Sequence, residues 1–457
     1  MSELQSTEIT KKYPYRRFIL GQITSLLGSE VIGYVLGWYI TLTYMNAFYL
    51  AMVMFLQFFP RIFISPIAGV FADRYDRKKI ILFSDMAQAV ITATLAVIYI
   101  IGFPQNWEIG VIYTFIVLRT IFQAIQRPAV SAVLPSITPA EKLSRLNGIL
   151  QLSGGLISLM GPLIALAFLK IPFLDTFDVL WIDVITFVFA FMLLLSVPIP
   201  MVQKTKIEHP QELKGSKFIR DFKEGISVTK EIKGITAILL LFAVANFLIT
   251  PVNTLSDLLI VQVHGGGVDE LTFISIFFST GLILGSILVS LIKKWNHQTF
   301  WMFVTVIGLF SGLIIVALAP YRNFWLMGAG GFVTTFGIPI FSTIVITTMQ
   351  LVVPNHKMGR FMGFMNAIMS LVTPIGYLIS GTIAQYTGII PLFIGSSVLA
   401  IILMVVIWTT SNIGNLEKIV REKLNQNQLI KKEQDRDSEQ KYISQISEPT
   451  ISESKDP

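Results

Sequence analysis

Long apolar stretches separated by short polar segments make up most of this chain. A helix needs about 20 largely apolar residues to cross the roughly 30 Å of hydrocarbon in a bilayer. Stretches of that length occur at residues 18–42, 47–71, 79–101, 108–130, 145–169, 178–199, 235–260, 271–293, 299–319, 324–350, 359–384 and 389–410. The pattern therefore predicts twelve membrane-spanning helices, the first two separated by a polar turn between Thr43 and Asn46.

One long polar segment divides the predicted spans into six and six. We expect a short N-terminal segment (1–17), a first six-helix bundle (18–200), a linker (201–234), a second bundle (235–410) and a largely disordered tail (411–457). Within the linker, Phe218 to Lys233 alternates apolar and charged residues at helical spacing, which fits either a helix on the inner membrane face or a solvated helix. The predicted fold class is an all-α membrane protein.

The composition supports a lipid environment. Of the 457 residues, 53% are hydrophobic and 14% are charged, whereas soluble chains carry roughly 25% charged residues. The first apolar stretch is too long for a signal peptide and no small-residue cleavage site follows it, so we expect the first helix to remain in the mature protein.

The distribution of Lys and Arg predicts the orientation. If both termini are cytoplasmic, the outer loops hold only Lys170 and Arg322, and Arg61 and Arg119 lie within spans. All the others of the 35 basic residues then fall in cytoplasmic loops and tails, as the positive-inside rule requires. The net charge of +7 therefore indicates a multi-pass protein of the cell membrane, not a nucleic-acid partner.

Several kinds of chemistry are not expected. The chain has no cysteine, which excludes disulfides, thiolate metal sites and cysteine nucleophiles. Its four histidines fall in predicted loops without metal-ligand spacing and are expected to be solvated: His209, His264, His297 and His356. No catalytic cluster or nucleophile motif stands out at either membrane face. We expect no metal, no cofactor and no enzymatic activity.

A charged run follows the second predicted span: Gly69-Val-Phe-Ala-Asp73-Arg74-Tyr-Asp76-Arg77-Lys78-Lys79. Gly69 lacks a side chain and would allow two helices to approach closely. Asp73, at a helix end, can pair with Arg77 or with the positive N-terminus of another helix. The basic residues hold the loop on the inner side of the membrane.

This run resembles the signature loop of the major facilitator superfamily, except that Asp76 stands where the family usually has Gly. The resemblance implies the major facilitator fold, and a loop that latches the two halves when the protein faces outward. Asp73 would then lie near the N-terminus of the eleventh span. Arg127 replaces the usual acidic partner at the inner end of span four, so one arm of the latch is missing. The expected latch residues are Gly69, Asp73, Arg74, Arg77, Lys78 and Lys79, with Gly359 and Arg360 before span eleven.

Further segments extend the resemblance over about residues 15–410. Arg119 with Gln123 resembles the span-four arginine motif. Gly161-Pro162 resembles the core of the antiporter motif, although a simple helix kink explains it equally well. The macrolide-efflux and enterobactin-exporter branch is indicated by Pro128-Ala129, Leu134-Pro135, Leu146-Asn147 and Trp181-Ile-Asp183.

Ionisable residues inside spans are costly and are therefore functional candidates: Glu30, Arg61, Arg119 and Asp183. Glu30 lies about 13 residues beyond Arg17, which places it roughly 20 Å deep. Asp85 lies near the inner end of span three, where water can reach it. From Leu271 to Ser411 charged residues occupy only loop positions, so we expect buried charges in the N-terminal half alone.

Glu30 is the candidate for proton coupling. A carboxyl group in an apolar cavity can bind and release a proton near neutral pH, and it would also attract a cationic amphipathic substrate. Arg61 or Arg119 could pair with Glu30, and the alternative role for Glu30 is a permanent structural ion bridge. Asp183 would lie about 7 Å from the outer end of its span, at the interface or in the site. Possible cavity-wall residues are Gln22, Tyr34, Trp38 and Asn246.

These observations favour a monomeric secondary transporter with its site between two bundles at mid-membrane. The expected function is export of amphipathic compounds, such as macrolide-like drugs or hydrophobic metabolites, by proton antiport. The alternatives are a dedicated exporter of a siderophore or peptide metabolite, a lipid-moving relative, and a channel or non-transporting sensor. Sodium coupling and import also remain open at this point.

Overall fold

The computed structural model of the chain is built of helices and describes residues 15–102, 107–138, 140–199, 227, 229, 234–292, 295 and 297–410. The first half contains α2 (Tyr15–Tyr44), α3 (Ala47–Arg74), α4 (Arg77–Ile101), α5 (Glu108–Ile137), α6 (Ala140–Leu169) and α7 (Leu180–Leu195). The second half contains α9 (Ile235–Leu248), α10 (Thr250–Leu258), the π-helical turn η2 (Leu259–Val263), α11 (Val268–Leu291), α12 (Gln298–Ala317), α13 (Phe324–Val352), α14 (Asn355–Thr387) and α15 (Ile389–Thr410).

The prediction of twelve spans is confirmed within the described residues. Eleven helical segments are long and apolar enough to cross a membrane, with α9, α10 and η2 together counting as one, and α7 is a shorter apolar helix of 16 residues. The first two spans are separate helices, because the Asn46 side chain accepts hydrogen bonds from the Phe48 and Tyr49 amides and so begins α3. The linker and the tail lie outside the described residues, apart from a few linker positions.

The seventh span differs from the continuous helix that the sequence predicts. Its α-helical ladder breaks between α9 and α10, because Pro251 has no amide proton to give to the Phe247 carbonyl. The Thr250 hydroxyl donates to Phe247 O instead, over 2.6 Å. The span therefore resumes as a short second helix, α10.

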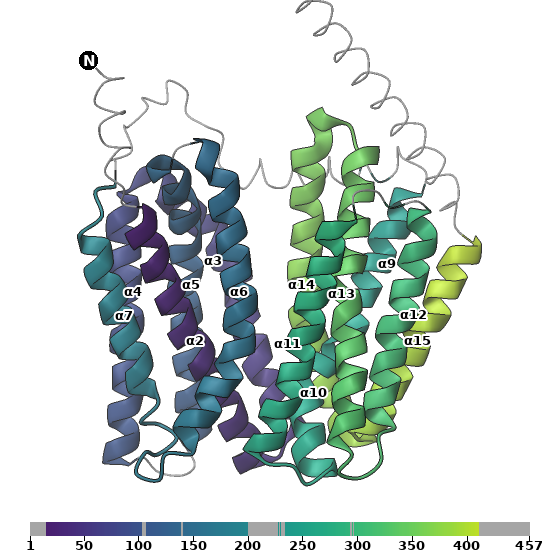
Figure 1. The fold of residues 1–457 in the computed structure, drawn as a ribbon, viewed down its shortest axis with the longest axis horizontal. Helices are drawn as coiled ribbons and strands as arrows, with labels where there is room; N and C mark the ends of the chain where they lie inside the picture. Colours follow the sequence, from purple (N-terminus) through teal and green to yellow (C-terminus); the bar gives the residue numbers. More distant parts are fainter. Residues whose placement is uncertain are drawn as a thin grey trace, which may run out of the picture.

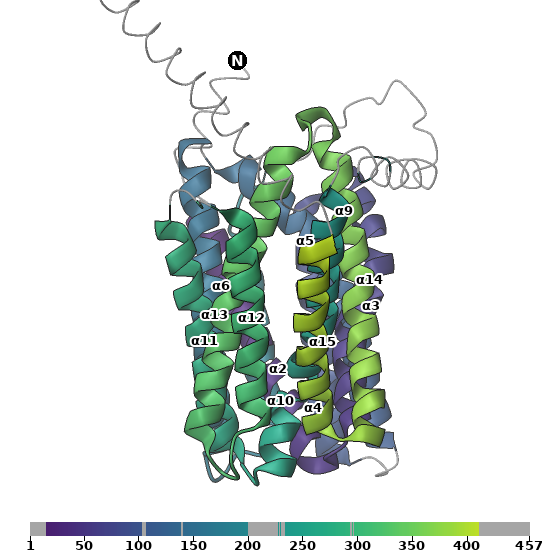
Figure 2. The same cartoon turned by 90° about the vertical axis from the view of Figure 1, so that its right-hand side faces the viewer.

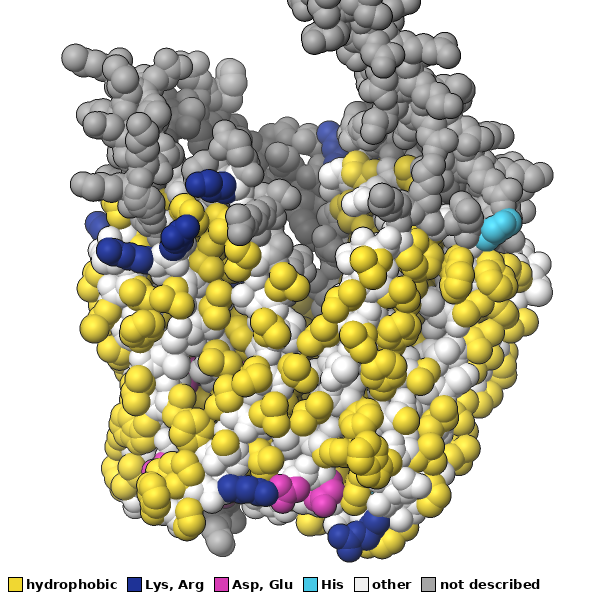
Figure 3. Space-filling model, in the orientation of Figure 1, with side chains coloured by type: hydrophobic (Ala, Val, Ile, Leu, Met, Phe, Trp, Pro, Cys, Tyr) yellow, Lys and Arg dark blue, Asp and Glu magenta, His cyan; other side chains and the backbone are white. Residues whose placement is uncertain are grey.

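The helices form two groups side by side, α2–α7 and α9–α15 (Figure 1), and one group lies in front of the other when the molecule is turned by 90° (Figure 2). We call the end that carries the start of α2 and the end of α15 the basic end, because Lys and Arg side chains gather there in Figure 3. The two groups approach each other towards the opposite end (Figure 1). Large apolar side chains cover much of the flank, as expected for a lipid-facing surface (Figure 3).

The halves are joined mainly by two helix pairs, α3 with α14 and α6 with α11, and α10 makes smaller contacts with α3 and α2. Gly381 of α14 lies so close to α3 that a Cβ there would overlap Ala51 and come within 2.8 Å of Ala47 O. In the second pair, Ser279 Oγ donates to Ser158 O over 3.0 Å. Small residues therefore permit close approach of the halves.

Candidate functional site

Glu30 and Tyr34 lie one helical turn apart on α2 and face Gly161 of α6. A Cβ at Gly161 would come within 3.2 Å of Glu30 Cγ and 3.1 Å of the Tyr34 ring. An added methyl group here would force Glu30 or the Tyr34 ring to shift by a few tenths of an ångström, so glycine favours this close packing of α6. Pro162, the second residue of the predicted kink, follows inside α6. The structure thus brings together the proton-coupling candidate, a wall candidate and the antiporter-like glycine.

A second acid approaches this cluster from the other half of the molecule. Asp257, half-buried on α10, is close enough to the Tyr34 hydroxyl to act on it electrostatically, as Glu30 does. The expectation that buried charges occur only in the N-terminal half is therefore wrong. Asp257 falls within the apolar stretch 235–260, and its polar neighbours after Pro251 are the signal that could have identified it. Carboxyl groups of both halves thus act on one tyrosine.

Arg119 pairs with Asp183 within the N-terminal half. The two side chains form an ion pair, and Arg119 Nη2 also lies 3.0 Å from Asp183 Oδ1 and donates to Ser29 Oγ over 2.8 Å. The Arg119 guanidinium lies 5.3 Å from the Phe187 ring centroid. The possible pairing of Arg119 with Glu30 is therefore not observed, because Arg119 on α5 pairs with Asp183 on α7.

Asp183 is not exposed at the membrane interface, which is one of the two locations that the sequence leaves open. Its side chain is fully buried and lies in the first turn of α7, where the helix dipole favours an acid. An ion pair that is buried on all sides has the geometry of a structural bridge, whose removal leaves an uncompensated charge.

Arg61 is also directed away from Glu30. Its Nη2 donates to Gln123 Oε1 over 3.0 Å, and its guanidinium lies 5.3 Å from the Phe58 ring centroid. The two polar residues that the sequence singled out on spans two and four, Arg61 and Gln123, are thus partners of each other. The possible pairing of Arg61 with Glu30 is wrong.

From its position in the sequence, Asp85 is expected to lie where water can reach it. The structure shows instead that its side chain is only 1% exposed. Gln126 of α5 donates to Asp85 Oδ1 over 2.7 Å, and Gln88 of α4 donates to Gln126 over 3.0 Å. Asp85, Gln88 and Thr92 follow helical spacing along α4, so the three polar side chains point together into the N-terminal half.

The predicted latch loop is held within the N-terminal half. Asp76 begins α4, since its carboxylate accepts from the amides of Lys78 and Lys79 over 2.9 and 3.4 Å. Arg77 donates to Ala132 O at 3.1 Å, and the Lys78 ammonium donates to Val197 O at 2.7 Å. Asp76, which stands where the family usually has Gly, therefore serves as the N-cap of α4. Arg77 and Lys78 bind backbone carbonyls near the ends of α5 and α7.

The close helix approach expected at Gly69 is absent from this conformation. A Cβ at Gly69 would meet open space, and the same is true at Gly359 and Gly363 on α14. Arg74 and Arg360 are exposed, and the side chain of Asp73 lies outside the described residues. The two halves thus meet away from the latch and towards the opposite end.

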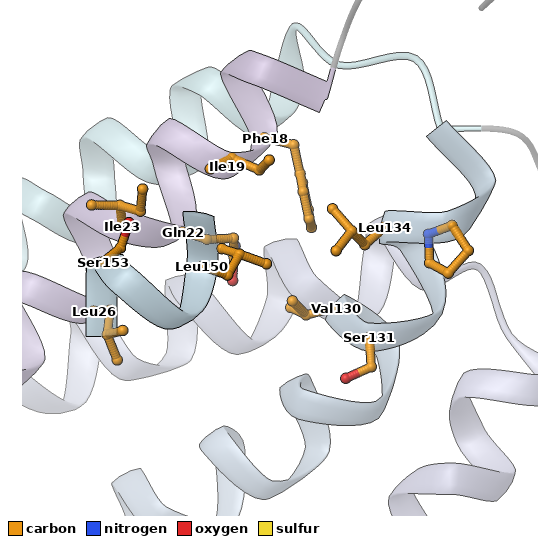
Figure 4. Close-up of a pocket in the computed structure, with 11 residues that line it drawn as sticks. Phe18, Ile19, Gln22, Ile23, Leu26, Val130, Ser131, Leu134, Leu150 and Ser153 are labelled. Atoms are coloured by element: carbon orange, nitrogen blue, oxygen red, sulfur yellow. The ribbon is translucent and has the colours of Figure 1, made fainter. Parts of the chain in front are cut away.

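The wall candidates have different surroundings. Gln22 lines a cavity of about 420 Å³ between α2, α5 and α6, together with mainly apolar side chains such as Phe18, Leu26 and Leu150 (Figure 4). Trp38 is buried and packs on Tyr34 at 5.6 Å between ring centroids, so it supports the tyrosine. Asn246 is half-buried on α9 and donates to Phe242 O.

Histidine and metal chemistry can be assessed in the described part of the chain. His264 is expected from the sequence to be solvated, but its side chain is buried beside the rings of Tyr321 and Phe324. Among the described residues no group of three His, Asp or Glu side chains could hold a metal ion.

Comparisons with known proteins place the chain among transporters. The family profile described as Major Facilitator Superfamily matches residues 18–376. Macrolide efflux protein A of Streptococcus pyogenes is 26% identical over 397 residues, which cover 87% of this chain and 96% of that protein. Macrolide efflux protein A of Enterococcus faecalis is 27% identical over 321 residues, which cover 70% of this chain and 96% of that protein. The staphyloferrin A transporter of Staphylococcus aureus is 31% identical over a shorter stretch of 127 residues, covering 28% and 31%.

Solved structures share the fold at low identity. A crystal structure of the nucleoside transporter NupG has a TM-score of 0.67 at 10% identity and covers 87% of this chain and 99% of its own. A bacterial homologue of the iron transporter ferroportin, in an inward-facing state, has a TM-score of 0.62 at 14% identity, covering 86% and 98%. These similarities show the architecture alone.

Proposed function

Because the chain belongs to the major facilitator superfamily and is a membrane transporter, we propose that it exports amphipathic cations of the macrolide type by proton antiport. It would act as a monomer in the cell membrane, with both termini in the cytoplasm. The observation that carries this proposal is the packing of Glu30 and Tyr34 against Gly161, on a helix, α2, that contacts α10, the helix of Asp257 in the other half. The two macrolide efflux proteins, each aligned with this chain over 96% of its length, support macrolide-type compounds as the substrate class.

Proton and substrate would compete for the acid on α2. Glu30 is half-buried, and no basic side chain is bonded to it among the described residues. An unpaired carboxylate in an apolar site gains from binding either a proton or an organic cation. Because each binds the same oxygens, arrival of one favours release of the other, which is the elementary condition for antiport.

Movement of the halves would make the site accessible from each side in turn. In the present conformation the halves approach each other at the end opposite the basic end (Figure 1). In the alternative conformation the loop from Asp73 to Lys79 would meet α14 near Gly359, where both Gly69 and Gly359 now have open space. The loop would then act as the latch that its resemblance implies.

The proposal is tested by efflux of a fluorescent lipophilic cation from cells that express the protein. We expect efflux to stop when the proton gradient is collapsed and when Glu30→Gln replaces the acid. Asp175→Asn, which changes an exposed acid in the loop after α6, is the matched control and should remain active. Undiminished efflux by correctly inserted Glu30→Gln would refute the coupling role.

A second candidate function is export of a siderophore, which is favoured by the local similarity to the staphyloferrin A transporter. Two acids at one site attract cations and repel anions. The two functions therefore separate on charge: transport of a carboxylate-bearing siderophore in preference to the lipophilic cation would favour the second.

A further inference from the structure

Asp85 is a buried acid that the proposed transport site does not use. Its side chain is 1% exposed on α4. Oδ1 accepts from Gln126 over 2.7 Å, whereas Oδ2 makes no hydrogen bond to any described residue. One oxygen of this carboxyl group is therefore held in place and the other is unbonded.

No cation pairs with Asp85 among the described residues that face it. The helix that carries Asp85, α4, packs against α5, α7 and, less closely, α3. On α5 and α7, Arg119 is already paired with Asp183, and Arg127 is exposed. On α3, Arg61 is bonded to Gln123.

The basic residues of α4 itself are also directed elsewhere. Arg77 and Lys78 donate to backbone carbonyls at the ends of neighbouring helices, and Lys79 is exposed. An ionised Asp85 would thus be a buried charge without compensation.

Hydrogen bonds through the side chain and the backbone carbonyl of Gln88 connect Asp85 with the ion pair of the N-terminal half. Gln126 accepts from Gln88 over 3.0 Å. Thr92 Oγ1 lies 2.9 Å both from Gln88 O and from Asp183 Oδ2, and it accepts from Arg119 Nη1 over 2.9 Å. A change of charge at one end of such a buried network alters the bonds along it.

The network ends beside the proposed coupling site. Arg119 Nη2 donates to Ser29 Oγ over 2.8 Å, and Ser29 directly precedes Glu30 on α2. Asp85 lies nearer the basic end, since it follows the start of α4 by only about two helical turns.

We propose that Asp85 is a second proton-binding site, whose occupancy is coupled through Gln126, Gln88 and Thr92 to the Arg119–Asp183 pair. A proton bound at Oδ2 neutralises the carboxylate and leaves Oδ1 as acceptor for Gln126. Loss of that proton restores the anion, so no other reactant is needed. The contribution of this site to transport rests on the proposed antiport, but the binding of the proton does not.

Infrared difference spectra of the full-length protein in lipid, recorded through a titration from acid to alkaline pH, test the proposal. A protonated carboxyl group has its own carbonyl-stretch band, which disappears on ionisation. We expect Asp85→Asn to lose one component of this band, and Glu30→Gln, as the matched control, to lose a different one. An identical carboxyl band in wild type and a folded Asp85→Asn variant overturns the proposal.

Gln126→Met provides a test that keeps the acid in place. Loss of the donor to Oδ1 should move the Asp85 component to higher frequency, because a hydrogen bond weakens the carbonyl bond. If Asp85→Asn does not fold, Gln126→Met becomes the test of the proposal. An unshifted carbonyl band in Gln126→Met then contradicts proton binding at Asp85.

Transport distinguishes the two proposals. We expect Asp85→Asn to lower proton-driven efflux of labelled erythromycin severalfold while exchange of erythromycin across the membrane continues. Full proton-driven efflux by Glu30→Gln, with the Asp85 band present, would refute the function proposed above but not the second proton site.

Discussion

Gly161 determines how closely α6 can approach the acid on α2. Its missing side chain leaves room for Glu30 Cγ and for the Tyr34 ring, each just over 3 Å from where a Cβ would lie. Both neighbours are side chains that can shift by a few tenths of an ångström. An added methyl group should therefore displace the site without unfolding the helix pair.

We accordingly expect Gly161→Ala to lower efflux severalfold while the amount of inserted protein stays unchanged. Gly154→Ala on the same helix is the control, because a Cβ there meets nothing within 4 Å. Efflux rates and membrane abundance should be measured together. Equal efflux by the two variants would show that contact with Glu30 does not matter.

The buried ion pair allows a prediction of stability. Arg119→Met leaves Asp183 charged and fully buried, which should cost about 3–5 kcal/mol of unfolding free energy. The double variant Arg119→Met/Asp183→Leu should recover much of the loss, because no charge then remains. Thermal unfolding in detergent measures both, and a double variant no more stable than Arg119→Met would contradict this explanation.

Residue types could be predicted from the sequence more readily than their partners. Glu30 and Tyr34 share a face because helical geometry alone fixes that relation. Which basic residue meets which acid depends on how α4, α5 and α7 rotate against one another, so the partners of Arg119 and Arg61 could not be read from spacing. Gly161 could be identified as a kink candidate, but not as the neighbour of Glu30.

At the scale of elements, the most irregular span is the seventh. It consists of α9, α10 and the π-helical turn η2 and ends at Val263, and His264 follows directly after it. Burial beside Tyr321 lowers the pKa of His264 from its usual value of about 6.5, although the backbone of Pro320 acts in the opposite direction. In the folded protein the His264 imidazole therefore binds a proton less readily than in the unfolded chain.

It follows that His264 stabilises the fold above about pH 6.5, and that this contribution is lost as the pH falls below that value. We expect the melting temperature to decrease with acidification, and to decrease less in His264→Phe, which keeps a ring between its aromatic neighbours. His297→Asn changes an exposed histidine and serves as the control. The same acid sensitivity in wild type and His264→Phe would exclude this histidine as the cause.

Helices could be predicted well because membrane-spanning segments are recognised by their length and hydrophobicity. Each of the twelve predicted spans corresponds to a helix or to a broken helix. Pro251 lies within the seventh apolar stretch and could have indicated the break, although the hydrophobic pattern alone predicts a continuous helix. The consequence of the break, a polar segment that presents Asp257 towards Tyr34, depends on packing and could not be inferred.

At the scale of the whole molecule, the two halves are also joined by an exposed ion pair at the end opposite the basic end. Lys170 follows α6 and pairs with Asp269 in the first turn of α11. Such a pair contributes little stability, but it identifies positions that must separate if the halves open at this end.

This separation can be tested in the native background, because the chain contains no cysteine. We expect Lys170→Cys/Asp269→Cys, joined by a short bis-maleimide, to stop efflux, because the link holds this end closed. Each single-cysteine variant, treated in the same way, should remain active. Full efflux by the linked protein would mean that transport does not require this end to open.

The central claim, exchange of protons for an amphipathic cation at Glu30, is tested most directly in proteoliposomes without an imposed pH gradient. An outward gradient of erythromycin would be established, and the internal pH followed with a trapped indicator. Antiport predicts that protons enter as erythromycin leaves, and that Glu30→Gln abolishes this proton movement. Erythromycin efflux through the wild-type protein with no change of internal pH would contradict the account.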